Sequence, residues 1–176
     1  IGLMGPGVDL HYNNKKKKNI AKLNRADVIF YNGLSLEGKM KDIFGKMARI
    51  KRIVAVADAI NKADLLQPDE LEGHYDPHIW FDVSLWSKTI DPVVRALSEI
   101  DSEGAESYKR NGDSYRKELD SLDEWVTEQV EHIPSGQRVL ITAHDAFSYF
   151  GQAYGIEVMG LQGISTVAEN GVNDVT

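Results

Sequence analysis

Three of the five histidines stand where an imidazole ring could bind a metal ion. His11 follows a glycine-rich turn, and His78 follows an Asp-Pro pair at a predicted helix start. His144 comes directly after a predicted strand, and ligands of open α/β sheets bind beyond the carboxyl ends of strands. Neutral imidazole is a common ligand of zinc and similar divalent ions. These three side chains are therefore the candidates for a metal site.

An aspartate lies within two residues of each candidate: Asp9, Asp76 and Asp145. A carboxylate beside a ligating imidazole fixes its tautomer and raises its basicity. No short motif such as His-Glu-x-x-His joins the three histidines, so structural hydrogen bonding remains the alternative for each of them. The other two histidines have structural explanations, because His74 lies in a polar loop and His132 near the C-terminal end of a predicted helix.

The elements that must position these residues follow an α/β pattern. Short apolar runs bounded by turn residues predict buried parallel strands at 28–31 and 53–56. The same α/β alternation predicts strands at 139–142 and 156–159. Helices are predicted at 19–26, 36–47 and 146–154. Asp76-Pro77 predicts the start of a further helix, which Pro92 should kink or divide.

A single long helix is predicted over residues 101–134, because its apolar side chains recur on one helical face. About thirty residues at a rise of 1.5 Å would extend roughly 45 Å, which suits a bundle member or a strut between two bodies. The segment contains ten acidic and four basic residues, a charge of −6 out of −7 for the whole chain. These charges are interpreted as a solvated face.

The composition excludes several classes of function. A net charge of −7 argues against binding to nucleic acid or to an anionic membrane. The content of 42% hydrophobic and 27% charged residues is that of a globular protein, and the absence of cysteine excludes disulfides and thiolate metal sites. No run of residues reaches the roughly 18 apolar positions of a membrane span. An opening at Ile1 without an initiator Met and a final loop at 169–176 suggest a piece of a longer protein.

Two blocks of the sequence are distinctive: Asp76-Pro77-His78-Ile79-Trp80-Phe81-Asp82 and Thr142-Ala143-His144-Asp145-Ala146-Phe147. Further matching stretches lie at 5–11, 26–37 and 154–166. With these motifs the chain resembles the TroA-like zinc/manganese solute-binding proteins of bacterial ABC transporters, a family that includes lipoprotein adhesins. The resemblance runs along nearly the whole chain.

The resemblance implies two α/β lobes with parallel sheets joined by one long linking helix. Residues 1–100 would form the N-terminal lobe, 101–134 the linking helix and 135–176 the beginning of an incomplete C-terminal lobe. The bound solute would be a zinc or manganese ion, held by His11 and His78 from the first lobe and His144 from the second. A fourth ligand, an aspartate, is expected downstream of residue 176.

The family implies a non-enzymatic protein that is periplasmic or extracellular, in part lipid-anchored, and that delivers its ion to an ABC permease in the membrane. One alternative is a zinc hydrolase, because three histidines with an open position form a catalytic pattern and Asp145 or Asp76 could act as general base. Another is an adhesin-type interaction protein in which the metal is incidental. Unpaired strand edges in an incomplete lobe also predict self-association.

Overall fold

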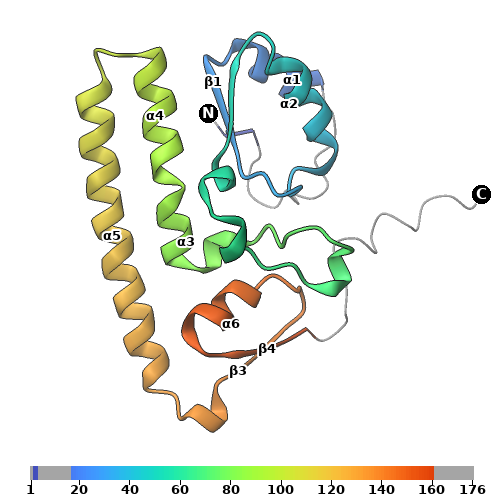
Figure 1. Cartoon of the computed structure of the whole chain (residues 1–176), viewed down its shortest axis with the longest axis vertical. Coiled ribbons are helices and arrows are strands. Elements are labelled where there is room, and N and C mark those ends of the chain that lie inside the picture. Colours follow the sequence, from blue (N-terminus) through green and yellow to red (C-terminus); the bar gives the residue numbers. More distant parts are fainter. Residues whose placement is uncertain (1, 4–16, 161–176) are drawn as a thin grey trace, which may run out of the picture. The chain divides into compact units, whose positions relative to one another are not determined.

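The structure is a computed structural model that describes residues 2–3 and 17–160 of the 176-residue chain (Figure 1). These residues divide into two compact units, one within Ile1–Ala59 and Thr89–Asp113, the other within Ile60–Lys88 and Ser114–Thr176. Each unit contains a two-stranded parallel sheet, which confirms the predicted α/β class with parallel sheets.

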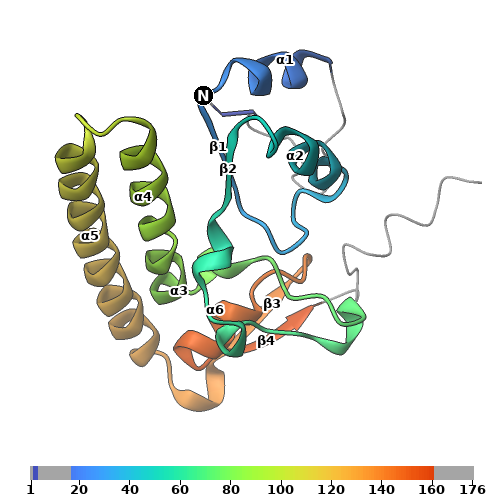
Figure 2. The ribbon, with the colours of Figure 1, turned by 45° about the horizontal axis from the view of Figure 1, so that its top comes forward.

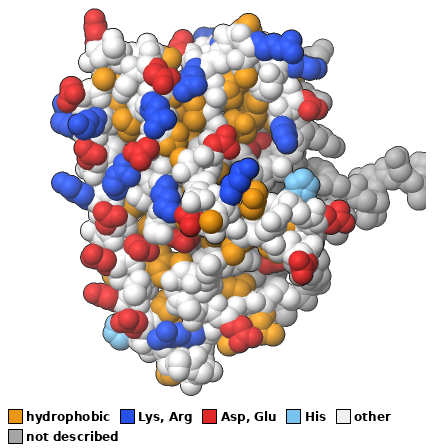
Figure 3. Space-filling model, in the orientation of Figure 1, with side chains coloured by type: hydrophobic (Ala, Val, Ile, Leu, Met, Phe, Trp, Pro, Cys, Tyr) orange, Lys and Arg blue, Asp and Glu red, His pale blue; other side chains and the backbone are white. Residues whose placement is uncertain are grey.

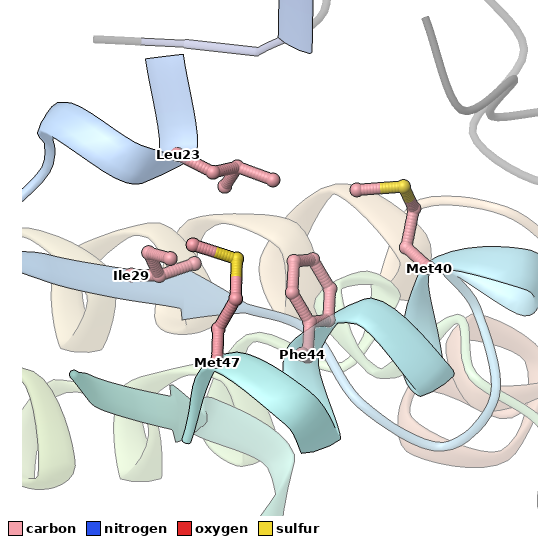
Figure 4. Close-up of a cluster of buried hydrophobic side chains, with 5 residues drawn as sticks. All are labelled: Leu23, Ile29, Met40, Phe44 and Met47. Atoms are coloured by element: carbon pink, nitrogen blue, oxygen red, sulfur yellow. The ribbon is translucent and has the colours of Figure 1, made fainter. Parts of the chain in front are cut away.

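The first unit is built on strands β1 (Val28–Tyr31) and β2 (Arg52–Ala55), which lie side by side in Figure 2. Helix α1 (Lys17–Arg25) precedes β1. A 3-10 turn, η1 (Gly38–Met40), leads into α2 (Lys41–Met47), which precedes β2. Apolar side chains from the two helices, the turn and β1 meet in one buried cluster (Figure 4): Leu23, Ile29, Met40, Phe44 and Met47.

A buried carboxylate organises the turn that follows β1. Glu37 accepts hydrogen bonds from the backbone N–H groups of Asn32 (2.6 Å) and Gly33 (3.2 Å). Burial raises the pKa of Glu37, although these two hydrogen bonds act in the opposite direction. Gly33 has φ +92°, and a Cβ there would lie 3.1 Å from that of Ala55, so this position requires glycine.

The helical segment after the second histidine differs from the prediction. No helix begins at Asp76-Pro77; a 3-10 turn, η5 (Ile79–Phe81), comes first, and α3 spans Val83–Lys88. Asp82 caps α3, because its Oδ1 accepts hydrogen bonds from Leu85 N–H (3.0 Å) and the Ser84 hydroxyl (2.7 Å). The prediction was wrong because Asp76 is engaged with His78, as described below.

The predicted division of this helical segment is present, but it lies at Thr89, between α3 and α4 (Ile90–Ile100). Pro92 is the third residue of α4. A proline in the first turn needs no N–H for the helical hydrogen-bond pattern, so it is tolerated there without a kink.

The long helix α5 spans Ala105–Glu131, within the predicted 101–134 (Figure 1). The turn before it is fixed by Asp101, which accepts hydrogen bonds from Gly104 N–H (3.1 Å) and the Tyr108 hydroxyl. These two donors, Tyr108 foremost, lower the pKa of Asp101. Acidic side chains are spaced along α5 at the molecular surface, as expected for a solvated face (Figure 3).

In the second unit, β3 (Val139–Thr142), α6 (Ser148–Tyr154) and β4 (Glu157–Gly160) form a βαβ segment. A Cβ on Gly151 would lie 2.6 Å from Val158 Cγ2, so α6 packs closely on β4. Strand β3 lies at its predicted residues, and burial alternates along it, with Val139 and Ile141 exposed. In the described part of the chain, no helix is long and apolar enough to cross a membrane.

The start of α5 packs so closely on α4 that Gly112→Ala should destabilise the protein. The added Cβ would lie 2.7 Å from Val94 Cγ2 and 3.1 Å from Ile90 Cγ2, and such overpacking costs about 1–3 kcal/mol. Gly45→Ala in α2 is the matched control, since nothing lies within 4 Å of its new Cβ and alanine favours the helix by about 0.5–1 kcal/mol. Urea unfolding should move the two variants in opposite directions; equal shifts would contradict the close α4–α5 packing.

The raised pKa of Glu37 predicts a pH-dependent difference between the wild type and Glu37→Gln. Because the folded state favours the protonated carboxyl, the stabilising contribution of Glu37 is present below the ordinary value of 4.5 and is lost as pH rises through the raised folded pKa. The free energy of unfolding of the wild type should therefore fall relative to that of Glu37→Gln as pH increases. Urea titrations across that range measure this difference, and a constant or opposite trend would refute it.

Candidate metal centre

His78 is a buried imidazole held by a buried carboxylate. The exposed fractions are 4% for His78 and 3% for Asp76. Asp76 Oδ1 lies 2.7 Å from His78 Nδ1 and also accepts the backbone N–H of His78 at 2.9 Å. A carboxylate can only accept hydrogen bonds, so it favours the tautomer in which Nδ1 carries the proton. The lone pair that can bind a metal is then on Nε2.

The second histidine of the candidate site, His144, lies between β3 and α6. Its ring centre is 5.3 Å from that of His78, with an angle of 80° between the ring planes. Two imidazoles that bind one tetrahedral zinc ion at about 2.0–2.1 Å have ring centres roughly 5 Å apart. The separation of the two rings therefore suits donation to a common ion.

Aromatic contacts connect the two segments that carry these histidines. The Trp80 ring stands edge-on to His78, with 5.3 Å between ring centres. Phe81 of η5 contacts Phe147, the residue before α6, with 4.2 Å between ring centres. These residues belong to the two distinctive sequence blocks, but their spacing in the sequence gave no signal that the blocks touch.

The structure tests only part of the predicted site. His11 and Asp9 lie outside the described residues. Within residues 2–3 and 17–160, no group of three His, Asp or Glu side chains is placed to hold a metal ion. Zinc takes four donors in structural sites, so His78 and His144 would supply half of such a set.

The predicted carboxylate partner of His78 is confirmed in Asp76, whereas the corresponding roles of Asp9 and Asp145 stay predictions. His74 and His132, assigned structural roles, are both exposed. The two candidate ligands therefore differ in their surroundings. The His78 imidazole is buried and fixed by Asp76, and the His144 imidazole lies beside it at the surface.

The two parallel βαβ-type units define an α/β protein, a class in which ligands bind beyond the carboxyl ends of strands, where His144 lies. A family model described as "Zinc-uptake complex component A periplasmic" matches residues 1–176. The chain belongs to this ZnuA family, which confirms the TroA-like resemblance seen in the sequence.

Similar curated proteins include the manganese-binding lipoprotein MntA of Bacillus subtilis, 43% identical over 173 residues, and the zinc-binding protein TroA of Treponema pallidum, 42% identical over 174 residues. These matches cover 98% and 99% of this chain and 56% of each relative. The metal ABC transporter substrate-binding lipoprotein SloC of Streptococcus mutans is 29% identical over 175 residues, which are 96% of this chain and 57% of SloC.

A solved structure of the periplasmic zinc-binding protein TroA from Treponema pallidum is similar with a TM-score of 0.88 and 41% identity. The match covers 92% of this chain and 58% of that structure. The chain therefore spans about half the length of the relatives it matches.

Proposed function

We propose that this chain provides much of the metal site of a solute-binding protein, which captures zinc or manganese and delivers the ion to an ABC importer. The observation that carries the proposal is the contact between His78 and His144, with His78 fixed by a buried Asp76. Relatives named for zinc binding, for manganese binding and for ABC transport support the same role.

The proposed ligands are His11, His78 and His144, with a fourth donor from an aspartate downstream of residue 176. The ion is the transported solute, and the imidazoles would hold it through their nitrogen lone pairs. In the whole protein, residues 1–100 and the part that begins at 135 would form two lobes joined by 101–134, in line with two separate parallel sheets. The packing itself groups Ile60–Lys88 with the residues from Ser114 onward.

The setting of Asp76 favours binding over hydrolysis. A general base must reach a water molecule that attacks the substrate. Asp76 is 3% exposed, and its Oδ1 accepts two hydrogen bonds from His78. This carboxylate is therefore committed to positioning an imidazole, and it is poorly suited to the catalytic role that the hydrolase alternative gives it.

The proposed location is the periplasm or the outer face of the cell membrane. Among similar proteins, TroA is named periplasmic in its solved structure, whereas MntA and SloC are named lipoproteins. A solute-binding protein at either location could reach an ABC permease, which is the proposed partner. Adhesin activity has no separate support among the described contacts.

The metal site predicts that His78→Ala weakens zinc binding while His74→Ala does not. Loss of a residue that only supports a ligand lowers metal affinity by roughly 10-fold or more. His78 is itself a proposed ligand, so its removal should lower the zinc affinity by at least that factor. His74 is an exposed histidine in a loop and serves as the matched control. Competition with a chromophoric chelator measures the affinities.

Because His78 is buried, His144→Ala at the exposed partner is a second variant with less risk to folding, which circular dichroism would monitor. The expected result is weaker zinc binding in both site variants. Wild-type affinity in His78→Ala and in His144→Ala would refute the assignment.

We also propose that this chain self-associates through the exposed face of the β3–β4 sheet. Val139 and Ile141 of β3 and Met159 of β4 are exposed, and Ile141 and Met159 are paired in register. In the described residues the sheet has only these two strands. A second copy could pair with an edge and cover the apolar face.

Sedimentation velocity at increasing concentration tests the self-association. Ile141→Thr keeps a β-branched residue but makes the face polar, so it should shift the chain toward monomer. Ile50→Thr is the control, because Ile50 is 79% exposed and lies outside the sheet. A wild type that stays monomeric, or an equal effect of both substitutions, would contradict this use of the sheet.

A further inference from the structure

Among the described residues of the second unit, Tyr149 is one of two large side chains that are fully buried, and Ile79 is the other. Tyr149 lies in the first turn of α6, five residues after His144, and is 1% exposed. A phenol ring contributes apolar packing, but its hydroxyl needs hydrogen-bond partners when it is buried. Those partners show what the residue does beyond packing.

Both partners of the Tyr149 hydroxyl belong to the chain segment that leads to His78. The hydroxyl donates to the backbone carbonyl of Asp76 at 2.9 Å. It also accepts the backbone N–H of Leu66 at 3.0 Å. Leu66 and Asp76 are themselves joined, because Asp76 N–H donates to the Leu66 carbonyl at 2.9 Å. The hydroxyl therefore closes a three-residue hydrogen-bonded ring around the backbone of Asp76.

The side chain of Asp76 in turn holds His78 through the ring nitrogen Nδ1 and the backbone N–H. A continuous series of contacts thus runs from α6 to the buried imidazole: Tyr149 hydroxyl, Asp76 backbone, Asp76 carboxylate, His78 ring. The segment that carries His144 leads directly into the same helix. Helix α6 therefore positions both histidines, His78 through Asp76 and His144 through the segment that leads into the helix.

Burial raises the pKa of Tyr149 to about 12, so its hydroxyl keeps its proton at neutral pH and remains a donor to Asp76. The Phe81–Phe147 contact adds an apolar link between the same two segments. The apolar link limits their separation but leaves rotation of the Asp76 peptide group open. The directional hydrogen bonds of Tyr149 restrict that rotation.

We infer that Tyr149 is a positioning residue: it fixes Asp76, and through it the His78 ring, relative to His144. The two imidazoles are then arranged for a common ion before the ion binds. This inference rests on the proposed metal-binding function and deepens it, since it names a residue that governs affinity without touching the ion. Pre-arranged ligands lose less conformational freedom on binding, so the loss of this arrangement weakens affinity.

The chain offers a matched control on the same helix. Tyr154 is also buried, and its hydroxyl donates to Asp123 Oδ1 of α5 at 2.6 Å. Tyr149→Phe and Tyr154→Phe therefore make the same chemical change: each removes one hydroxyl group, and with it one hydrogen-bond donor, from α6. Of the two tyrosines, only Tyr149 is hydrogen-bonded to Asp76. A general loosening of α6 would therefore affect both variants, whereas a positioning effect on His78 would be seen in Tyr149→Phe alone.

The first measurement uses the chain without metal. ¹⁵N-edited NMR of the imidazole rings reports the tautomer of His78, and nuclear Overhauser contacts report its proximity to His144. The wild type and Tyr154→Phe should show the Nδ1-protonated tautomer and contacts between the rings, whereas Tyr149→Phe should lose those contacts. Unchanged spectra in Tyr149→Phe, or equal losses in both variants, would overturn the inference.

The second measurement is zinc affinity by chelator competition. Tyr149→Phe should bind zinc roughly 10- to 100-fold more weakly than the wild type, as expected for loss of an outer-shell partner, while Tyr154→Phe keeps wild-type affinity. Equal affinities of the two variants would overturn the effect on binding. If the wild type and His78→Ala bind zinc equally, the proposed function fails, and the NMR measurement still decides whether Tyr149 positions His78.

Discussion

The burial of Asp76 together with His78 is the constraint on which the candidate site depends. A carboxylate or an imidazole taken out of water alone is costly, so each requires the other as a hydrogen-bond partner. Their contact fixes the backbone as well as the ring, because the same carboxylate oxygen accepts the N–H of His78. A single carboxylate oxygen therefore fixes the local path of the chain, the orientation of the His78 ring and its tautomer.

Helix α6 extends this constraint to the second histidine. It packs closely on β4 through Gly151, contacts η5 through the residue before it, and reaches Asp76 through Tyr149. None of these contacts involves the ring of His144 directly. They fix the loop and helix from which that ring extends, which is how a site formed by distant sequence positions gains a defined geometry.

The sequence predicted the elements well where the hydrophobic pattern was clear. Strand β3 was placed at its observed residues, and α5 was within four residues at either end. The helix expected at Asp76-Pro77 was wrong because an aspartate can cap a helix or hold an imidazole, and only tertiary contacts decide between these roles. The exposure of alternate residues in β3 could not be predicted, since an apolar run does not reveal how many faces of a strand are covered.

The same limit applied to the site. The residues alone suggested His78 and His144 as separate candidates, and the family resemblance brought them together. The contact of Tyr149 with Asp76 joins positions 73 residues apart, for which no spacing rule exists. Hydrogen bonds of that range become visible only once the βαβ segment has been placed in space.

The choice between zinc and manganese cannot lie in the His78–His144 pair alone. For a given set of nitrogen donors, manganese binds most weakly among the common divalent transition metals and zinc much more strongly. A pair of imidazole donors therefore favours zinc over manganese. Two relatives of nearly equal identity to this chain are named for different metals, so overall similarity does not select one either. Selectivity for manganese would have to come from the remaining donors. These would be oxygen ligands, and they would give a coordination number above the four that suits zinc.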